Sequence, residues 1–361
     1  MSIRSIVRVS AENSASQILQ YFHDALQGGS TLIVDPQNLL YQSDVEILQA
    51  LPSDTSLLLP TSGSSGNPKF VIFSKASLLA SAKLSCEFLM AQSGDTWSLL
   101  LPLTHIAGFN VLARSIYLES ELITETDLNA DFTAIVPTQL HRALFPKNKE
   151  DEKLFLHLIS CKAVLVGGAA LSNQLKELAN DKGVNVVTTY GSSETSGGCI
   201  YDGVCLPGVN YKISNDGVIQ ISGPTLATGY LSNQNLQITN FPKGWYQSND
   251  SGEVIEDKLV ILGRADDVII SGGEKISLIR LENLLQELFP NIQFLAGKLN
   301  NPEWGEQLVL LYQGEIEAAL IREFIKKHLP NYYLPKQIKK VDQLPTISIG
   351  KPARNLIAQY F

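Results

Sequence analysis

A glycine- and serine-rich loop between two apolar runs constrains the fold most, in residues 57–74 (LLLPTSGSSGNPKFVIFS). Residues 57–59 and 70–73 have the composition of β-strands, and the loop 61–69 joins them. Glycine lets the backbone approach a ligand closely, and successive N–H groups, hydroxyls and a lysine can donate to phosphate oxygens. The loop therefore predicts a site for a nucleoside triphosphate, although Ser/Gly clusters also occur in ordinary hairpin loops.

This loop differs from the P-loop of kinases and ATPases. The pattern GxxxxGK[ST] does not fit it, and the residues after Lys69 have the composition of a strand. A P-loop lysine is followed by a helix instead, so a P-loop ATPase or kinase is disfavoured.

Charge and composition argue against several classes of protein. The 361 residues carry a formal net charge of −8, so the basic surface of a nucleic-acid-binding protein is not expected. No apolar run is long enough to span a membrane, and the first residues lack the apolar segment of a signal peptide. The 4 cysteines form no CxxC pair and the 5 histidines lack metal-ligand spacing. These features favour a cytoplasmic protein with reduced thiols and no zinc site.

Short apolar runs and helix patterns alternate over the first half of the chain. Strands are predicted over 31–34, 97–103, 133–136, 163–166 and 184–189, and helices over 76–90, 109–118 and 172–180. This alternation is typical of an α/β domain with much parallel sheet.

The rest of the chain divides into two further parts. Between 203 and 264, short β-type runs are separated by Gly, Pro, Asn and Asp, which predicts a small β-barrel or meander. Residues 265–361 then carry two helix and two strand patterns, enough for a separate α+β module. We therefore predict an N-terminal domain over 1–264, which includes the β-rich part, and a C-terminal domain over 265–361.

Five further segments carry residues suited to binding and activating a nucleotide. Glu194 lies in YGSSET after a predicted strand, where α/β proteins place ligands, and one carboxylate there can hold Mg²⁺ against phosphate oxygens. Asp250, in GWYQSND, could accept hydrogen bonds from both hydroxyls of a ribose. GRADD at 263–267, SGGE at 271–274 and Lys351 complete the series. Taken singly, each could instead be an ordinary exposed turn residue.

The order of these motifs resembles that of the adenylate-forming superfamily, which contains acyl- and aryl-CoA ligases, adenylation domains and luciferases. TSGSSGNPK at 61–69, YGSSET at 190–195, GRADD at 263–267 and GK at 350–351 carry the resemblance. It implies an α/β fold, with a large N-terminal domain of layered sheets plus a small β-barrel, and a small mobile α+β C-terminal domain. It also implies a carboxylic acid substrate, ATP and CoA as co-substrates, and Mg²⁺.

The resemblance implies roles in a first, adenylate-forming step. The ATP site would comprise Thr61, Ser62, Gly63, Ser64, Ser65, Gly66, Lys69, Gly168, Tyr190, Gly191, Ser193, Asp250 and Arg264. In this site the loop and Lys69 would hold the β- and γ-phosphates, and Glu194 would hold Mg²⁺. Asp250 and Arg264 would bind the ribose. Lys351 would contact the reacting carboxylate and the α-phosphate.

A second, thioester-forming step is implied as well. Gly272 and Gly273 would border the tunnel for the pantetheine arm of CoA, and Asp266 would be a hinge. We expect the C-terminal domain to rotate about Asp266, so that Lys351 leaves the site and the glycine loop replaces it.

Three segments are similar to one branch of the superfamily, the 2-succinylbenzoate–CoA ligases of menaquinone and phylloquinone synthesis. They are LPLTHIAG at 101–108 with Arg114 after it, VPTQL at 136–140, and IISGGE at 269–274.

This branch implies a substrate with a second carboxylate that is not activated. We expect Arg114 to meet that carboxylate, and Thr138 and Gln139 to donate to the keto or carboxylate oxygens. His105 would contact the substrate or gate the site, and Gly168 would line the acyl pocket. The alternatives are a packed loop histidine for His105 and a surface arginine for Arg114.

The chain departs from the superfamily pattern in places. The phosphate loop begins at Thr61, so much of the usual N-terminal region is missing or compressed, and a homodimer could cover the sheet edge that this exposes. Ser248-Asn249-Asp250 replaces Thr-Gly-Asp, and Ser193 stands where threonine is common. Neither change removes a charge that the mechanism needs.

Three alternative functions stay open. The chain could be a CoA ligase for another aryl or acyl acid, or an adenylation enzyme that loads a carrier protein. It could also be a catalytically inactive nucleotide-binding protein. The presence together of Lys69, Glu194, Asp250, Arg264 and Lys351 argues against the last alternative.

Overall fold

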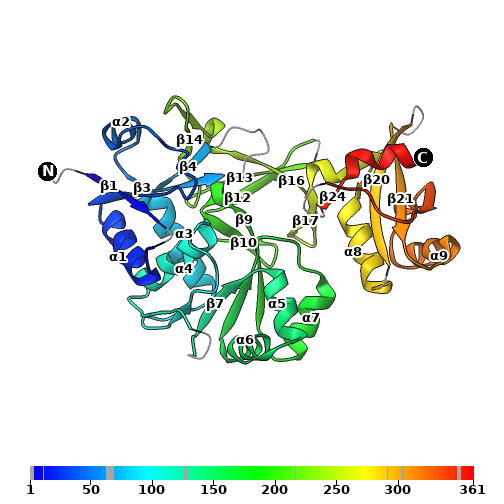
Figure 1. Ribbon diagram of the computed structural model, residues 1–361, viewed down its shortest axis with the longest axis horizontal. Helices are drawn as coiled ribbons and strands as arrows, with labels where there is room; N and C mark the ends of the chain where they lie inside the picture. Colours follow the sequence, from blue (N-terminus) through cyan, green and yellow to red (C-terminus); the bar gives the residue numbers. More distant parts are fainter. Residues whose placement is uncertain are drawn as a thin grey trace. The chain divides into compact units, whose positions relative to one another are not determined.

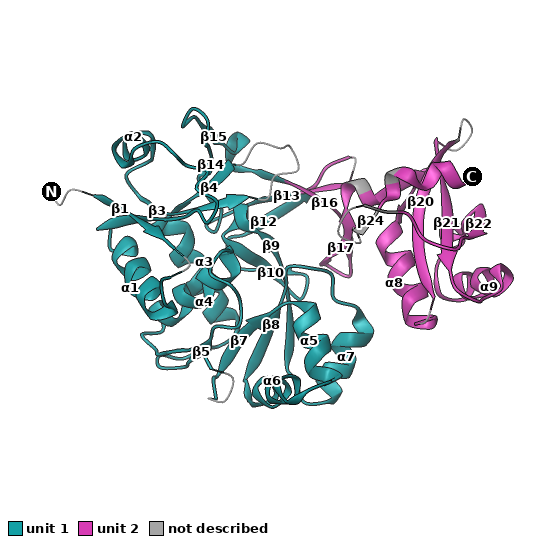
Figure 2. Ribbon diagram, viewed as in Figure 1, with its two compact units in different colours: residues 1–212, 220–247 teal, residues 213–219, 248–361 magenta. Residues whose placement is uncertain are grey.

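The protein is described by a computed structural model that covers residues 4–10, 12–61, 69–125, 129–215, 217–290, 292–301, 305–347 and 351–361. It divides into two compact units, coloured teal and magenta in Figure 2. Unit 1 comprises Met1–Lys212 and Gln220–Gln247, and unit 2 comprises Ile213–Ile219 and Ser248–Phe361.

Unit 1 contains a six-stranded sheet in the order β1-β2-β3-β4-β14-β15. Its strands are β1 (Ser5–Val9), β2 (Ser30–Val34), β3 (Thr55–Thr61), β4 (Lys69–Ser74), β14 (Gly229–Ser232) and β15 (Ile238–Asn240). The first three strands run parallel, and the others pair antiparallel. The helices of this region are α1 (Ala15–Leu26), α2 (Asp44–Ala50) and α3 (Lys75–Phe88). Ser14 and Ser43 begin α1 and α2 with capping boxes, which satisfy the free N–H groups of the first turn.

Unit 1 also contains a seven-stranded sheet in the order β11-β10-β9-β8-β7-β5-β6. Its strands are β5 (Trp97–Ser98), β6 (Leu122–Ile123), β7 (Phe132–Ile135), β8 (Ala163–Val166), β9 (Val186–Ser192), β10 (Gly197–Tyr201) and β11 (Val204–Cys205). Strands β5 to β9 are parallel, and β10 and β11 are antiparallel. The other elements are α4 (Ile106–Tyr117), α5 (Pro137–Leu144), α6 (Lys149–Ser160), α7 (Asn173–Asp181) and the 3₁₀ turn η1 (Ser193–Thr195).

Helices cover the seven-stranded sheet on both faces. Helices α5, α6 and α7 lie along one face and share an apolar cluster with β7, β8 and β9 (Figure 1). Helices α3 and α4 contact β10, and they share a second cluster with β2, β3 and β4 of the six-stranded sheet. Because α4 lies between the two sheets, most of its residues are buried on every side. This position explains how a polar residue of α4 can become part of an interior site.

A four-stranded sheet follows, in the order β12-β13-β16-β17. Its strands are β12 (Asn210–Ile213), β13 (Val218–Ser222), β16 (Tyr246–Ile255) and β17 (Lys258–Arg264). The 3₁₀ turn η2 (Pro242–Gly244) precedes β16. The chain passes from one unit to the other within β12, β13 and β16.

Unit 2 is completed by a five-stranded sheet in the order β19-β18-β21-β20, with β22 paired to β21. Its strands are β18 (Val268–Ser271), β19 (Glu274–Ser277), β20 (Gln293–Asn301), β21 (Gly305–Gln313) and β22 (Gln337–Lys340). Helices α8 (Leu278–Leu288) and α9 (Ala318–His328) share the apolar core on one face, and Ile357 packs against β20 and β21 residues in a separate cluster. The remaining elements are η3 (Ala265–Asp267), η4 (Asn331–Tyr333), β23 (Thr346–Ile347), β24 (Lys351–Pro352) and η5 (Arg354–Tyr360).

The layered α/β fold expected from the alternating pattern is confirmed, with some differences in its elements. The predicted strand 97–103 is a strand only at Trp97–Ser98, and the helix predicted over 109–118 begins earlier, at Ile106. The predicted small β-barrel corresponds to the four-stranded sheet, but β14 and β15 leave it and pair with the six-stranded sheet. The domain boundary at 264 and 265 stays a prediction.

Among the described residues, no helix combines the length and the apolar character that crossing a membrane requires.

Candidate active site

A cavity of about 620 Å³ lies in unit 1, where β8 and β9 end and α4 and α5 begin. The carboxyl ends of parallel strands are the usual ligand site of such sheets. Of the residues predicted from the sequence, those that line the cavity are His105, Arg114, Gln139, Gly168, Gly191 and Ser193. The fold thus brings together residues from segments that are far apart in the chain.

Glycines form part of the cavity wall because no side chain would fit there. A methyl group added to Gly191 would lie 2.0 Å from the carbonyl oxygen of Gly197. A methyl group on Gly197 would lie 2.0 Å from Nδ2 of Asn110, and Gly197 has a φ of +89°, which side chains disfavour. Side chains are therefore excluded at these two positions of the wall.

Arg114 is the main charged group of the cavity, and it is buried rather than on the surface, with 3% of its area exposed. Its Nη2 donates a hydrogen bond to the hydroxyl of Tyr201 (3.2 Å), and its Cζ lies 4.7 Å from the centre of the Trp97 ring. Its Nε has no hydrogen-bond partner among the described residues, and no carboxylate of that part of the chain pairs with it. A buried cation without a counter-charge favours binding of an anion from outside.

Two further residues of the cavity were not predicted from the sequence. Tyr201 accepts the hydrogen bond of Arg114 and donates one to Oγ of Ser85 (2.8 Å). Nδ2 of Asn110 donates to the carbonyl of Ser196 (2.8 Å), while its Oδ1 finds no partner in the described structure. Asn110 and Arg114 stand four residues apart in an apolar helix, and this spacing could have indicated Asn110. No local pattern indicates Tyr201.

The loop predicted to bind phosphates joins β3 and β4, so the predicted strands on both sides of it are confirmed. Thr61 lies opposite Lys69 in the antiparallel pairing, and Oγ1 of Thr61 donates to the carbonyl of Lys69 (3.3 Å). The loop residues Ser62, Gly63, Ser64, Ser65 and Gly66 lie outside the described residues.

Glu194, the predicted Mg²⁺ ligand, lies in η1 directly after β9. Its Oε1 accepts a hydrogen bond of 2.7 Å from the hydroxyl of Tyr230, whose ring centre lies 5.6 Å from Nζ of Lys69. Burial, and then the charge of Glu194, raise the pKa of the Tyr230 hydroxyl, so it stays a donor. Tyr230 is a third residue that the sequence analysis missed.

These residues fit Mg²⁺ in the way that nucleotide-binding proteins hold it. No cluster of three or more His, Cys, Asp or Glu side chains with metal-ligand geometry occurs in the described part of the chain. Mg²⁺ is usually held by one or two carboxylates together with phosphate oxygens and water, rather than by an all-protein cage. Glu194 offers such a carboxylate.

The remaining predicted substrate residues differ in position. His105 precedes the first residue of α4, is exposed and lines the cavity. Gln139 uses its amide within the protein, since Nε2 donates to the carbonyl of Leu100 and Oε1 accepts from the N–H of Val136. Thr138 is exposed and is not among the residues that line the cavity. Tyr190 is partly buried in β9.

The predicted ribose ligands lie in unit 2. Asp250 and Arg264 stand directly opposite each other in the pairing of β16 and β17. The N–H of Asp250 donates to Oγ of Ser248 (3.0 Å), which donates to the carbonyl of Ile219 (2.9 Å). Ser248, at the position where the superfamily pattern has threonine, therefore keeps a hydroxyl that orders the backbone of β16.

The predicted CoA and lid residues also belong to unit 2. Gly272 and Gly273 form the tight turn between β18 and β19, with φ angles of 59° and 88°. Lys351 lies in β24, opposite Ile347. The side chains of Asp266 and Lys351 are outside the described part of the structure.

The sequence analysis missed an ion-pair network close to both residues in the chain. The network joins η5, which begins three residues after Lys351, to η3, which contains Asp266, and to α8. Nε of Arg354 donates to Oδ1 of Asp267 (2.8 Å), and Nη2 donates to Oε2 of Glu282 (2.8 Å). Oε1 of Glu282 also accepts from the N–H of Ala296 (2.7 Å). Burial raises the pKa of Glu282, and Arg354 acts in the opposite direction.

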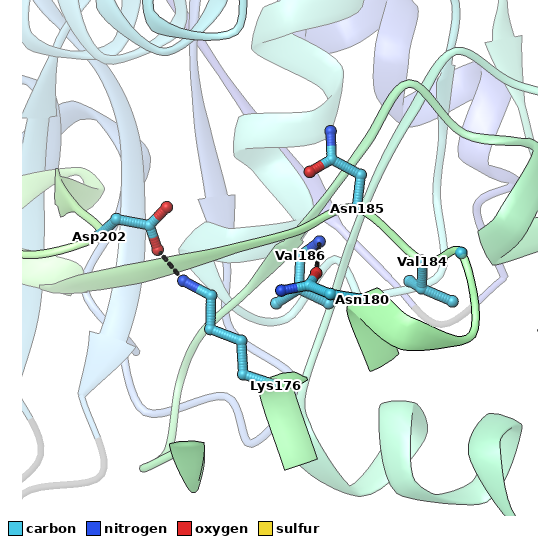
Figure 3. A pocket seen from close by; sticks show the side chains of 7 residues that line it. Lys176, Asn180, Val184, Asn185, Val186 and Asp202 are labelled. Atoms are coloured by element: carbon cyan, nitrogen blue, oxygen red, sulfur yellow. Dashed lines mark hydrogen bonds and ion pairs between the residues drawn. The ribbon is translucent and has the colours of Figure 1, made fainter. Parts of the chain in front are cut away.

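A second hollow of about 420 Å³ lies beside α7 and β9 (Figure 3). Its two charged groups neutralise each other, because Nζ of Lys176 lies 2.6 Å from Oδ1 of Asp202. Oδ1 of Asn180 accepts from the N–H of Val186 (3.2 Å). Since these polar groups already have partners, the hollow gives no argument for a ligand.

Comparison with known proteins identifies the family. Residues 6–231 match the family described as AMP-binding enzyme. A probable 2-succinylbenzoate–CoA ligase of Mycobacterium tuberculosis is 30% identical in an alignment 380 positions long, gaps included, which covers 96% of each chain.

Solved structures share the fold. Escherichia coli MenE with a bound phenylether-linked analogue of OSB-AMS superposes with a TM-score of 0.73 at 24% identity, over 99% of this chain and 88% of that one. O-succinylbenzoate coenzyme A synthetase (MenE) of Bacillus subtilis, in complex with ATP and a magnesium ion, gives a TM-score of 0.71 at 20% identity, over 98% and 89%. At these identities the likeness concerns the fold alone.

Proposed function

The chain belongs to the AMP-binding enzyme family, and we propose that it is an AMP-forming 2-succinylbenzoate–CoA ligase. It would convert 2-succinylbenzoate, ATP and CoA into 2-succinylbenzoyl-CoA, AMP and pyrophosphate through an acyl-adenylate, with Mg²⁺ as cofactor. The thioester would serve menaquinone or phylloquinone synthesis.

Arg114 carries the choice of substrate. It lines a cavity of about 620 Å³, is almost fully buried, and has no carboxylate partner among the described residues. 2-Succinylbenzoate has two carboxylates, of which only one is activated. The other would pair with Arg114 through charge-assisted hydrogen bonds, which are about twice as strong as neutral ones.

In the first step, the substrate carboxylate attacks the α-phosphorus of ATP, and pyrophosphate leaves with the electron pair of the broken P–O bond. We propose that Lys69 and the loop that Thr61 begins hold the β- and γ-phosphates, and that Lys351 stabilises the charge growing on the α-phosphate. Mg²⁺ bound by Glu194 would neutralise part of the phosphate charge. The protein thus positions two anions that otherwise repel each other.

In the second step, the CoA thiolate attacks the carbonyl carbon of the acyl-adenylate, and AMP leaves. The thiol needs the space that Lys351 occupied. We propose that the C-terminal module turns about Asp266 and presents the turn formed by Gly272 and Gly273 to the pantetheine arm.

A direct test is to mix the purified chain with 2-succinylbenzoate, ATP, Mg²⁺ and CoA, and to search for 2-succinylbenzoyl-CoA by mass spectrometry. The thioester is expected only when all four are present. Benzoate, which lacks the second carboxylate, is the control substrate and is expected to react far more slowly. Equal or faster use of benzoate, or no pyrophosphate release with 2-succinylbenzoate, would contradict the proposed function.

We also propose that the protein is cytoplasmic. In support, no disulfide occurs between the cysteines of the described part.

We further propose that the protein is a homodimer. Strand β1 forms one edge of the six-stranded sheet, and a second copy would cover this edge. Light scattering after size-exclusion chromatography should give twice the chain mass, and a monomer at micromolar concentration would refute the dimer.

A further inference from the structure

The contact between Tyr230 and Glu194 is a feature that the proposed roles do not use. The Tyr230 hydroxyl donates to Oε1 of Glu194 at 2.7 Å, and the described residues give this carboxylate no other side-chain hydrogen bond. One oxygen of Glu194 is therefore fixed, and the other is left for a ligand. A carboxylate that is held at one oxygen offers a metal ion a defined second oxygen.

The same chain segment holds the backbone of Glu194. The N–H of Ala227 donates to the carbonyl of Glu194 (2.8 Å), and the N–H of Thr228 donates to the carbonyl of Ile72 in β4 (2.9 Å). In the pairing of β14 with β4, Tyr230 lies opposite Val71. The segment from Ala227 to β14 therefore connects Glu194 rigidly to β4.

Strand β4 begins at Lys69, the cation at the end of the phosphate loop. Lys69 lies opposite Ser232 of β14, and its Nζ is 5.6 Å from the centre of the Tyr230 ring. Phe241 packs edge-on against this ring with centres 5.4 Å apart, which limits its rotation. Tyr230 thus contacts both Lys69 and Glu194.

We propose that Tyr230 is a positioning residue for metal-bound ATP. Its hydroxyl orients the Glu194 carboxylate toward the metal ion, and its ring limits where the Lys69 ammonium lies, so the two groups stay at a fixed separation. This inference rests on the proposed function, because it takes Mg²⁺-ATP as the ligand of Glu194 and Lys69.

The effect of losing the hydroxyl follows from this geometry. In Tyr230→Phe the ring remains beside Lys69 and Phe241, but the carboxylate is free to rotate, so the metal site is no longer preformed. Loss of a residue that orients a metal ligand typically weakens metal affinity by about 10- to 100-fold. Binding of ATP without metal does not use the carboxylate and should be unchanged.

Calorimetric titration of ATP into the chain, with Mg²⁺ or with EDTA and without any acid substrate, tests this inference. We expect Tyr230→Phe to weaken binding of Mg²⁺-ATP about tenfold and to leave binding in EDTA unchanged. Tyr41→Phe, at a residue that is 73% exposed, is the matched control and should behave like the natural chain. Because no turnover is needed, the result does not depend on the identity of the acid.

The Glu194→Gln background separates positioning from general damage. If Tyr230 acts through Glu194, adding Tyr230→Phe to Glu194→Gln should change Mg²⁺-ATP affinity by less than twofold. Equal Mg²⁺-ATP affinity in the natural chain and Tyr230→Phe would overturn the inference, and so would equal losses with Mg²⁺ and with EDTA. If the metal dependence appears as expected but no acid is activated, the proposed function fails and the role of Tyr230 stands.

Discussion

Two arginines, one in each unit, show how differently the two regions treat a positive charge. Arg114 in unit 1 is 3% exposed and contacts neutral groups, the Tyr201 hydroxyl and the Trp97 ring. Arg354 in unit 2 has 21% of its side chain exposed and pairs with both Asp267 and Glu282.

The difference agrees with the proposed binding role of Arg114 and with a structural role of Arg354. The charge of Arg354 is already compensated, so this residue holds η5 to η3 and α8. The charge of Arg114 is uncompensated among the described residues, so the cost of burying it is offset only when an anion enters the cavity.

The largest effect is expected from the lysine that lies three residues before Arg354. Lys351→Ala should lower acyl-adenylate formation by about a thousandfold, because in the proposed mechanism it removes a group that stabilises transition-state charge. Conversion of supplied acyl-adenylate and CoA to the thioester should stay within about threefold of the natural chain. Pyrophosphate release and thioester formation, measured separately, check this split. Equal losses in both half-reactions would remove the role given to Lys351.

The second effect concerns the uncompensated arginine. Arg114→Ala should lower kcat/KM for 2-succinylbenzoate by roughly thirtyfold, since a hydrogen bond to a charged group contributes about 2 kcal/mol. For benzoate, which has no second carboxylate, the loss should be less than about threefold. Steady-state rates with both acids check the difference, and Arg114→Lys should retain part of the preference. The same loss on both acids would assign Arg114 to the structure alone.

The two arginines should also differ in their effect on stability. Arg354→Met leaves Asp267 and Glu282 side by side without a counter-charge, which we expect to destabilise unit 2 by about 2 kcal/mol, a value reduced for partial exposure. Arg114→Met removes a buried charge that lacks an ionic partner and should change stability by less than about 1 kcal/mol. Calorimetric unfolding of both variants checks the order. A larger loss in Arg114→Met would reverse the comparison.

The smallest expected effect is on how the stability of unit 2 depends on pH. Burial raises the pKa of Glu282 above its ordinary value, so the folded state binds this proton more tightly than the unfolded state does. Its contribution to stability is therefore fully present below the ordinary pKa of glutamate, and it is lost as the pH rises through the raised value. Without Arg354, which opposes the shift, the pKa should rise further and the loss should be steeper.

Unfolding of the natural chain and of Arg354→Met at a series of pH values tests this. The stability difference between them should widen from acidic pH toward neutrality. Adding Glu282→Gln to Arg354→Met should flatten the dependence. A difference that is constant with pH would mean that Glu282 does not respond to Arg354.

The sequence by itself determined the features that depend on near neighbours in the chain. The strand, glycine loop and strand around Thr61 and Lys69 follow from composition and turn chemistry, and the caps at Ser14 and Ser43 follow from residues three apart. The order of the motifs was enough to indicate the family. The motifs also indicated Glu194 and Arg114 as candidate site residues. They did not indicate which side chains contact these two residues.

Only the tertiary structure decided which distant side chains meet. Tyr201 reaches Arg114 across 87 positions of sequence, and Tyr230 reaches Glu194 across 36. These contacts depend on the pairing of β14 with β4 and on the burial of α4 between two sheets. Local periodicity encodes neither the pairing of β14 with β4 nor the burial of α4. Strand pairing and layer packing are set by the total burial of apolar surface over the whole unit. The same burial leaves Arg114 with neutral contacts, and so gives it the capacity to bind an anion.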